Sequence, residues 1–320
     1  MYIYLDFVSR FACAMCGSCC RNAWLVTVDK DRYRANAALF ARTGRAAEFA
    51  AAFLPLTGGA PGEYAAIAKR PDGACWFLAA DNHCRLHREA GHDHLDGVCR
   101  LFPRYPVDTA RGTELTLSFS CPEVIRLASR PEPLQVVRSD HPPTATDEDD
   151  FVAAVFPGQQ PPSSPLRYYF ELEHHFIDIM QARPLPLAER LAFLRRTVTA
   201  LGAIGRLPSP GDSLRRLIHE NYDRLDALPS APAEDSPAAI LAENYLVSLI
   251  FKKIFYLSGL EPAMALLEGI WREIRPAGAG RGDAYRRISQ AIMAIEFRHS
   301  HTSRHRTDAA APADSPQNTS

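Results

Sequence analysis

The positions of the cysteines constrain this chain more than any other feature. All eight cysteines of the 320 residues lie between Cys13 and Cys121, and four of them form the motif Cys-x-x-Cys-x-x-Cys-Cys. Cys19 and Cys20 are adjacent, and consecutive Cα atoms are about 3.8 Å apart, below the roughly 4.4–6.8 Å of an ordinary disulfide. A disulfide between these two would be strained. Such short spacings therefore predict metal binding or redox chemistry in a reducing compartment.

The first motif, Cys13-x-x-Cys16-x-x-Cys19-Cys20, has the two-residue spacing that lets a tight turn direct successive thiolates at one centre. Gly17 lies inside the motif, and glycine adopts a positive φ at no steric cost. The same spacing occurs in zinc sites and in iron–sulfur clusters, where a distant cysteine followed by proline often completes the ligand set. Cys121-Pro122 fits that remote role. Zinc and iron both remain open on this spacing.

A second group of cysteines, Cys75, Cys84 and Cys99, has wider spacings and encloses four histidines. The histidines could add nitrogen ligands, although histidines in so polar a stretch are more often solvated. Incidental buried cysteines do not fall at ligand spacing with an adjacent pair, so all eight cysteines are predicted to bind metal. Because adjacent side chains seldom reach one metal together, Cys20 is predicted to serve a second site or to be a packing residue. The four histidines are His83, His87, His92 and His94.

Basic residues accompany both cysteine groups. Arg100 and Arg104 follow Cys99 in the segment RLFPR, and Arg21 follows Cys20. Guanidinium groups at these positions could offset the charge of anionic thiolates. Arg100 and Arg104 are therefore predicted to help bind the cofactor.

The order of these motifs resembles a known family, the zinc- or iron-chelating CxxCxxCC proteins. The shared features are the first motif, the Cys-x8-Cys pair, a cysteine followed by Phe-Pro-Arg, and the segment Ser120–Glu123. Within that group the chain looks most like the flagellin lysine N-methylases. That closer likeness rests on Trp24, on the CWFL segment Cys75–Leu78 and on the ENYLV segment Glu243–Val247.

The resemblance implies a [4Fe–4S] cluster, S-adenosylmethionine as the methyl donor and lysine side chains of flagellin as acceptors. Zinc is the alternative metal. The alternative function is a non-enzymatic zinc- or iron-binding protein with a structural, electron-transfer or iron-handling role. Zinc predicts a colourless protein with closed thiolate sites, whereas a cluster predicts a brown protein.

The sequence itself lacks the usual sign of a dinucleotide-type methyltransferase, a glycine fingerprint between a strand and a helix. Gly58-Gly59-x-x-Gly62 is the nearest stretch, and it follows a helical segment, so we interpret it as a turn. One option is that three cysteines bind a cluster while the donor's amino and carboxylate groups occupy the fourth iron. The spacing differs from the CxxxCxxC of most radical enzymes, which leaves radical and polar methyl transfer both open.

Polar transfer requires a neutral lysine amine, and free lysine has a pKa of about 10.4, so a base or a desolvating pocket is needed. The candidate catalytic residues are Tyr245, Asn244 and Glu243, on a largely apolar helix. Asn244, Ser248 and Lys252 form a polar stripe along that helix. A solvent-exposed face is the plainer explanation of the stripe. The cluster at residues 171–175, with two glutamates and two histidines, is also explained most simply as a solvent-exposed face of a helix.

The changes in composition along the chain predict an α+β protein. Its parts are a small cysteine-cluster (iron–sulfur) module with short strands and helices at residues 1–125, a proline-rich linker at 126–165, a mainly α-helical domain at 166–298 and a disordered tail at 299–320.

Local patterns predict individual elements. We expect strands at residues 24–28 and 114–119, a helix capped by Asp29 and ended by Gly44, a helix at 46–54 and a hairpin that carries Cys75. In the second half, apolar periodicity predicts helices through 169–179, 187–201, 213–228, 237–257, 262–274 and 285–295.

Charge and hydropathy exclude several classes of function. The formal net charge of −1 provides no basic field for nucleic acid or anionic lipid. No uncharged apolar window of membrane-spanning length occurs, and the first ten residues, MYIYLDFVSR, do not resemble a signal peptide. The sequence therefore predicts a cytoplasmic protein without nucleic-acid or membrane partners.

Overall fold

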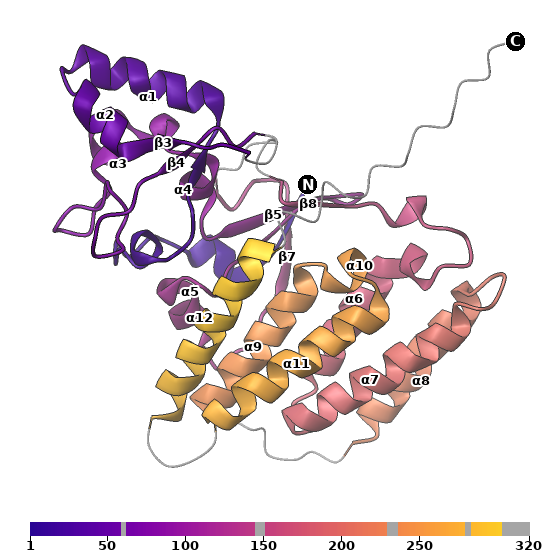
Figure 1. The fold of residues 1–320 in the computed structure, drawn as a ribbon. Coiled ribbons are helices and arrows are strands. Elements are labelled where there is room, and N and C mark those ends of the chain that lie inside the picture. The colour runs from indigo at the N-terminus through magenta and orange to yellow at the C-terminus, as the bar shows by residue number, and fades with distance from the viewer. Residues whose placement is uncertain (59–61, 145–150, 229–235, 279–282, 303–320) are drawn as a thin grey trace, which may run out of the picture. The chain divides into compact units, whose positions relative to one another are not determined.

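The computed structural model describes residues 1–58, 62–144, 151–228, 236–278 and 283–302, in two compact units (Figure 1). Unit 1 consists of Met1–Ala14 and Leu101–Ile295, and unit 2 consists of Met15–Arg100 and the chain from Glu296 onward. The mixture of helices and sheets confirms the predicted α+β class. The units differ from the predicted division at residue 125, because residues 1–14 and 101–125 have their contacts in unit 1.

Unit 1 contains a five-stranded sheet with the order β7-β1-β6-β5-β8. β5 and β6 form an antiparallel hairpin, β1 runs parallel to β6, and β8 runs parallel to β5. Both edge strands come from residues 126–165, the predicted linker, since extended segments pair readily with open sheet edges. The strands are β1 Tyr2–Leu5, β5 Arg104–Thr109, β6 Gly112–Leu117, β7 Val136–Ser139 and β8 Ala153–Val155.

α9 is the central helix of unit 1, largely apolar and buried along nearly its whole length. α9 contacts α5, α6, α11 and β6, and α7 lies beside α8 and α11 (Figure 1). The helices are α5 Pro122–Ala128, α6 Tyr169–Gln181, α7 Leu187–Ile204, α8 Gly211–Asp226, α9 Pro237–Phe251, α10 Ile254–Leu257, α11 Leu260–Gly278 and α12 Ala284–Thr302, with 3-10 turns η1 Asp6–Arg10, η5 Pro157–Gln159 and η6 Pro165–Tyr168.

Unit 2 has its own core, an aromatic cluster of Phe40, Phe53 and Phe77 with ring centroids 5.5–6.1 Å apart. Asp29 caps α1 as predicted, and its side chain accepts a 2.8 Å hydrogen bond from the Arg32 amide. The predicted hairpin forms as a short antiparallel pairing after β4: Lys69 bridges Cys75, and the amide of Trp76 donates to the Ala68 carbonyl at 3.0 Å. β4 itself also pairs with β2 and β3. The elements are β2 Thr27–Val28, α1 Lys30–Arg42, α2 Ala46–Ala52, β3 Phe53–Pro55, β4 Ala65–Ile67, α3 Arg85–Ala90 and α4 Gly97–Leu101, with η2 Cys19–Arg21 and η3 His92–His94.

The predicted helices of the second half are confirmed, with one interruption and one extension. The predicted helix at 237–257 breaks at Lys253, whose φ of +68° separates α9 from α10. α12 continues to Thr302, past the predicted start of the tail at residue 299. The rest of that tail and residues 59–61 of the predicted glycine turn lie outside the described residues.

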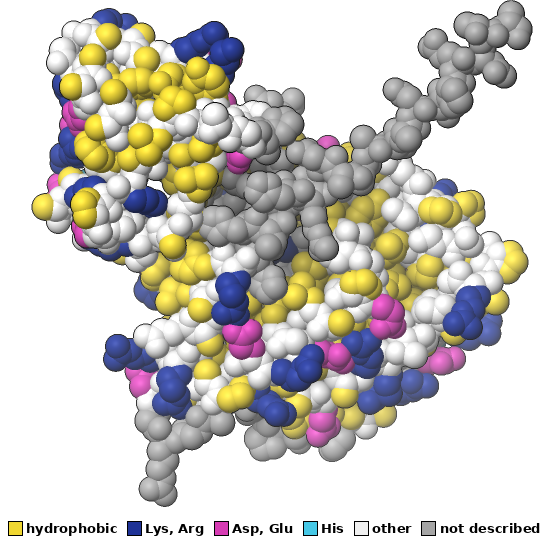
Figure 2. Space-filling model, in the orientation of Figure 1, with side chains coloured by type: hydrophobic (Ala, Val, Ile, Leu, Met, Phe, Trp, Pro, Cys, Tyr) yellow, Lys and Arg dark blue, Asp and Glu magenta, His cyan; other side chains and the backbone are white. Residues whose placement is uncertain are grey.

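The surface carries charges of both signs and no sign of a membrane span. Figure 2 shows basic and acidic side chains interspersed over α7 and α11, where Arg195 pairs with Glu261 and Glu268. Among the helices of the described ranges, none is both long enough and apolar enough to cross a membrane.

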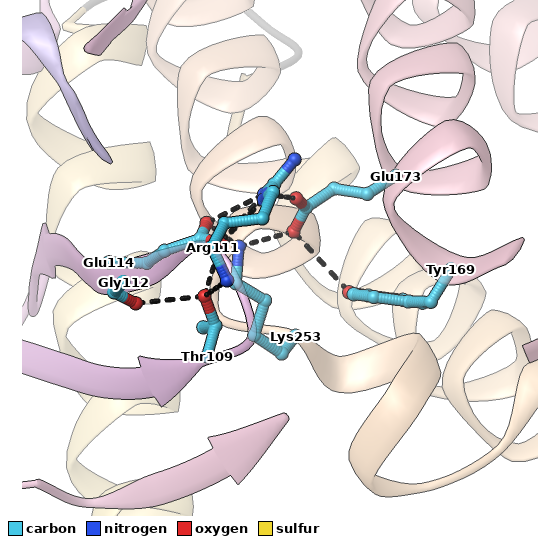
Figure 3. A network of polar contacts seen from close by, with 7 residues as sticks. All are labelled: Thr109, Arg111, Gly112, Glu114, Tyr169, Glu173 and Lys253. Carbon is cyan, nitrogen blue, oxygen red and sulfur yellow. Dashed lines mark hydrogen bonds and ion pairs between the residues drawn. The ribbon is translucent and has the colours of Figure 1, made fainter. Parts of the chain in front are cut away.

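Lys253 lies at the centre of a buried charge network in unit 1 (Figure 3). Its Nζ donates to Glu114 Oε2 on β6 at 2.6 Å and to Glu173 Oε1 on α6 at 2.5 Å. Arg111 donates to both carboxylates, at 2.7 Å and 2.9 Å. Two cations thus balance two anions. Burial opposes the ionisation of both acids. At Glu114 the charges of Lys253 and Arg111 outweigh burial, so its pKa falls. At Glu173 burial is the larger effect, so its pKa rises.

Replacing Lys253 with Met should destabilise unit 1 by about 3–5 kcal/mol, because it leaves two buried carboxylates with one cation. Denaturant unfolding of the full chain measures this loss. The double variant Lys253→Met/Glu173→Gln should recover part of the lost stability, since one uncompensated charge is removed with the lysine. A double variant less stable than Lys253→Met alone would contradict the assignment.

A second buried polar cluster in unit 1 should make stability depend on pH. His175 is buried, and burial lowers its pKa to about 4. Asn221 donates to its Nε2 at 3.0 Å, which keeps the ring neutral. Between pH 6.5, its ordinary pKa, and about 4, the unfolded chain takes up a proton that the native protein does not. The free energy of unfolding should therefore fall by up to about 3 kcal/mol as the pH drops through this window.

Unfolding of wild type and His175→Gln between pH 4 and 7 checks this dependence. Glutamine can still accept from Asn221 but does not titrate, so the variant should lose this part of the pH slope. Equal slopes in the two proteins would show that His175 does not titrate as described.

Candidate metal centre

Six of the eight cysteines belong to unit 2, and the other two, Cys13 and Cys121, belong to unit 1. All eight are free thiols. Cys13 is exposed, and Cys121 is buried just before α5. The six in unit 2 are Cys16, Cys19, Cys20, Cys75, Cys84 and Cys99.

The first motif folds as a tight turn around Gly17. Gly17 has a φ of +69°, as predicted, and its carbonyl accepts hydrogen bonds from the amides of Cys20 and Arg21, both at 3.1 Å. Arg21 fixes the turn from outside, because its Nη2 donates to Asn82 Oδ1 at 2.6 Å. The Sγ atoms of Cys19 and Cys20 lie 4.0 Å apart. The turn thus presents two adjacent thiols on one short 3-10 segment.

Backbone hydrogen bonds bring the second cysteine group to this turn. The amide of Cys75 donates at 2.7 Å to the carbonyl of Cys20, which lies 55 positions earlier in the sequence. Cys84 pairs with Leu78 in a bridge and lies directly before α3, while Cys99 lies within α4. The two groups separated in the sequence therefore meet in unit 2.

The thiols of unit 2 influence one another's ionisation. A hydrogen bond from the Cys20 thiol lowers the pKa of Cys19 to about 7, although burial opposes this, and the same bond raises the pKa of Cys20. Burial raises the pKa of Cys75 and Cys84. Solvent reaches part of Cys99, yet the protein around its sulfur and the Asp96 carboxylate raise its pKa well above the ordinary value. Binding a metal to these thiols would therefore release protons.

The side chains do not form a finished metal site as they stand. Across the described ranges, no group of three or more His, Cys, Asp or Glu side chains lies close enough to hold one ion. The donor set nevertheless fits a thiophilic metal, because soft thiolates suit zinc and iron–sulfur clusters. A second observation points the same way: Asp96 Oδ2 is buried among these thiols without a hydrogen-bond partner in the described chain.

Asp96 is the site residue that the sequence analysis missed. It is 2% exposed, and its Oδ1 accepts from the amides of Val98 at 2.7 Å and Cys99 at 3.2 Å. The only available sequence signal was a carboxylate three residues before a predicted ligand.

The four histidines of unit 2 differ in exposure. His87 and His92 are exposed, as the solvated interpretation expects, with ring centroids 5.8 Å apart. His83 and His94 are half-buried. His83 Nδ1 contacts the Asp81 carbonyl, and His94 Nδ1 contacts Asn36 Oδ1, both at 3.0 Å.

The predicted cofactor arginines lie in different units. Arg100 belongs to unit 2, where its amide donates to the Asp96 carbonyl at 3.0 Å. Arg104 belongs to unit 1, where its Nε donates to Thr144 Oγ1 at 2.8 Å. Their role in cofactor binding stays a prediction.

The predicted catalytic residues lie inside the core of unit 1. The exposed fractions of Glu243, Asn244 and Tyr245 are 2%, 0% and 1%. Arg190 and Arg183 hold the Glu243 carboxylate at 2.6 Å and 2.8 Å, and Asn244 Nδ2 donates to the Ala128 carbonyl at 2.7 Å. Tyr245 packs against Phe119, with ring centroids 5.1 Å apart.

The exposed-face explanation of the polar stripe is wrong, because Asn244, Ser248 and Lys252 are all buried. Ser248 contacts Thr116 of β6 at 3.1 Å, so at this position the stripe faces the sheet. The cluster at residues 171–175 divides: Glu173 and His175 are buried, whereas Glu171 and His174 face solvent.

Two cavities, of about 110 Å³ and 250 Å³, lie between α7 and α8. They share Phe193, Arg196 and Arg224. None of the predicted site residues lines either cavity.

Comparison with known proteins agrees with this geometry. Residues 12–122 match the family described as "CxxCxxCC: Putative zinc- or iron-chelating domain". This match covers the cysteine-rich part of the chain and less than half of its length. The domain includes all eight cysteines and Asp96, and thus the two cysteine groups that meet in unit 2.

The chain is also similar to two proteins named Lysine-N-methylase, as the resemblance in the motifs predicted. It is 30% identical over 164 residues to the protein of Salmonella typhimurium (strain LT2) and 29% identical over 164 residues to that of Salmonella choleraesuis (strain SC-B67). Each alignment covers 48% of this chain and 38% of the relative, so the matched region is less than half of the relatives' length. No solved structure matches the fold.

Replacing Gly17 with Ala should weaken metal binding about tenfold, since a positive φ costs a Cβ roughly 1–2 kcal/mol. The added Cβ would also lie 2.4 Å from Arg21 Nη1, so Arg21 must leave Asn82. Gly73→Ala is the matched control, because Gly73 has a φ of +81° but no heavy atom within 4 Å of the added carbon. Zinc affinity measured by chelator competition should fall in Gly17→Ala alone. Equal losses in both variants would contradict a specific role for this turn.

Proposed function

We propose that this protein binds a metal centre through its cysteine cluster and methylates lysine side chains of a protein substrate. The observation that carries the proposal is the meeting of the two cysteine groups in unit 2, tied by the 2.7 Å hydrogen bond between the Cys75 amide and the Cys20 carbonyl. The CxxCxxCC domain supports the metal, and the similarity to lysine-N-methylases supports the reaction.

In its specific form, the proposal names a [4Fe–4S] cluster, S-adenosylmethionine as the donor and flagellin as the substrate, in the cytoplasm. When bound, a cluster with an open iron supplies an anchor for the amino and carboxylate groups of the donor. The cysteines of unit 2 would hold it as thiolates, and the Arg100 guanidinium of the same unit would offset their negative charge. Acceptor lysines must reach the donor as neutral amines, which requires loss of a proton before transfer.

The contacts of the three predicted catalytic residues differ, and so do the catalytic roles that each could have. Arg183 and Arg190 bind the Glu243 carboxylate, so Glu243 acts as a base only if this ion pair opens. The amide nitrogen of Asn244 is bound to the Ala128 carbonyl, which gives Asn244 a role in joining α9 to α5. Tyr245 packs against Phe119, and Tyr245→Phe removes its hydroxyl while keeping that ring contact.

The test is co-expression of the full chain with flagellin under anaerobic conditions, with metal analysis and mass spectrometry of flagellin. Wild type should contain iron and sulfide and should add multiples of 14 Da to flagellin lysines. Cys16→Ala should lose both the metal and most of the methylation, because a missing thiolate leaves an iron under-coordinated.

Ser18→Ala is the matched control for Cys16→Ala. It changes a side chain in the same turn, one that accepts from the Cys16 thiol at 3.3 Å, but removes no predicted ligand. This control should keep its metal and its activity. Zinc without sulfide, together with unmodified flagellin, would instead favour the non-enzymatic zinc protein. Full methylation by Cys16→Ala would overturn the role of the first motif.

A further inference from the structure

Asp96 is a buried carboxylate without a compensating cation. The residue is 2% exposed, and no Lys, Arg or His side chain of the described ranges forms an ion pair with it. Amides of Val98 and Cys99 occupy Oδ1, while Oδ2 is buried and lacks a hydrogen-bond partner in the same ranges. Burying an uncompensated carboxylate is costly, so such groups in proteins are paired or bind metal ions.

The residues around Asp96 add to the negative charge that a cation would balance. The amide of Cys99 donates to the carboxylate, and burial, together with the negative charge of Asp96, raises the pKa of the Cys75 and Cys84 thiols. The thiols become anionic when they bind a metal. Without a cation the carboxylate opposes every thiolate next to it, whereas a bound cation satisfies the carboxylate and the thiolates together.

The buried carboxylates of unit 1, in contrast to Asp96, are paired with cations. Glu114 and Glu173 are as deeply buried as Asp96, but Lys253 and Arg111 balance them. Unit 2 provides no such side chain for Asp96 in the described ranges. Among the described residues, no side chain supplies the cation that an ionised Asp96 requires, so a bound metal ion is the candidate.

We propose that Asp96 is a ligand of the metal centre and supplies a carboxylate oxygen beside the sulfur of Cys99. The inference rests on the proposed function only for its metal-binding part. The amides of Val98 and Cys99 hold one carboxylate oxygen, and the other is left for the ion. A mixed set of thiolates and a carboxylate suits zinc or iron, since both metals accept sulfur and oxygen donors.

The competing explanation is that Asp96 only caps the short helix α4. Asn caps helices about as well as Asp, so Asp96→Asn keeps the hydrogen bonds to both amides and removes the anionic ligand. The test titrates the metal-free full chain with Co²⁺ alone and records the sulfur-to-cobalt charge-transfer and d–d bands. Asp96→Asn should bind at least tenfold more weakly and with shifted d–d bands, whereas a mere cap predicts wild-type affinity and spectrum.

Two further variants keep the result interpretable. Asp93→Asn makes the same change of charge at an exposed position of the same segment and should bind Co²⁺ like wild type. Asp96→Glu retains a carboxylate and should recover part of the affinity, even if Asp96→Asn unfolds. Equal weakening by Asp93→Asn, or no recovery in Asp96→Glu, would overturn the inference.

The outcomes also separate this inference from the proposed function. If wild type binds cobalt and Asp96→Asn matches it in affinity and spectrum, Asp96 is not a ligand and the metal-binding proposal stands. If wild type binds neither cobalt, zinc nor iron, the metal-binding proposal fails and the role of Asp96 fails with it.

Discussion

The buried ammonium of Lys253 is the interaction on which unit 1 depends. It joins Glu114 of β6 to Glu173 of α6 at the point where the left-handed Lys253 separates α9 from α10 (Figure 3). These elements are far apart in the sequence, so the charge network fixes how the sheet, α6 and the central helix fit together. Three ionised side chains of this network are almost fully buried, and burial is tolerable only because each charge has opposite charges within hydrogen-bonding distance.

Unit 2 presents the opposite electrostatic situation. Its buried carboxylate, Asp96, lies near the buried Cys75 and the half-buried Cys84, and no cation is paired to that carboxylate in the part of the chain that the structure describes. Acidic groups that repel one another destabilise a protein core, but together they favour the binding of a metal cation. The same rule of charge balance thus assigns a structural role to Lys253 and a binding role to Asp96.

Several features followed from the sequence because short-range physics decides them. Asp29 caps α1 because its carboxylate reaches an amide three residues away, and Gly17 adopts a positive φ because it has no Cβ. The helices of the second half followed from apolar periodicity, although the break at Lys253 did not, since an isolated helix has no reason to stop there. The short hairpin that carries Cys75 also followed from the sequence, because Pro71, Asp72 and Gly73 are residues that favour a tight turn.

The sequence by itself determined the spacing of the cysteines, the α+β class and the resemblance to CxxCxxCC proteins, because residue type, spacing and periodicity are local properties of the chain. Only the tertiary structure decided which polar groups are buried and what satisfies them. Ser248 was predicted to lie on an exposed stripe, yet it contacts Thr116, which is 132 positions away in the sequence. The local sequence pattern does not predict that contact. In the sequence, Asp96 likewise has no feature that distinguishes it from an exposed loop acid. Its burial is evident only in the folded protein, because burial and charge balance depend on residues that folding brings together.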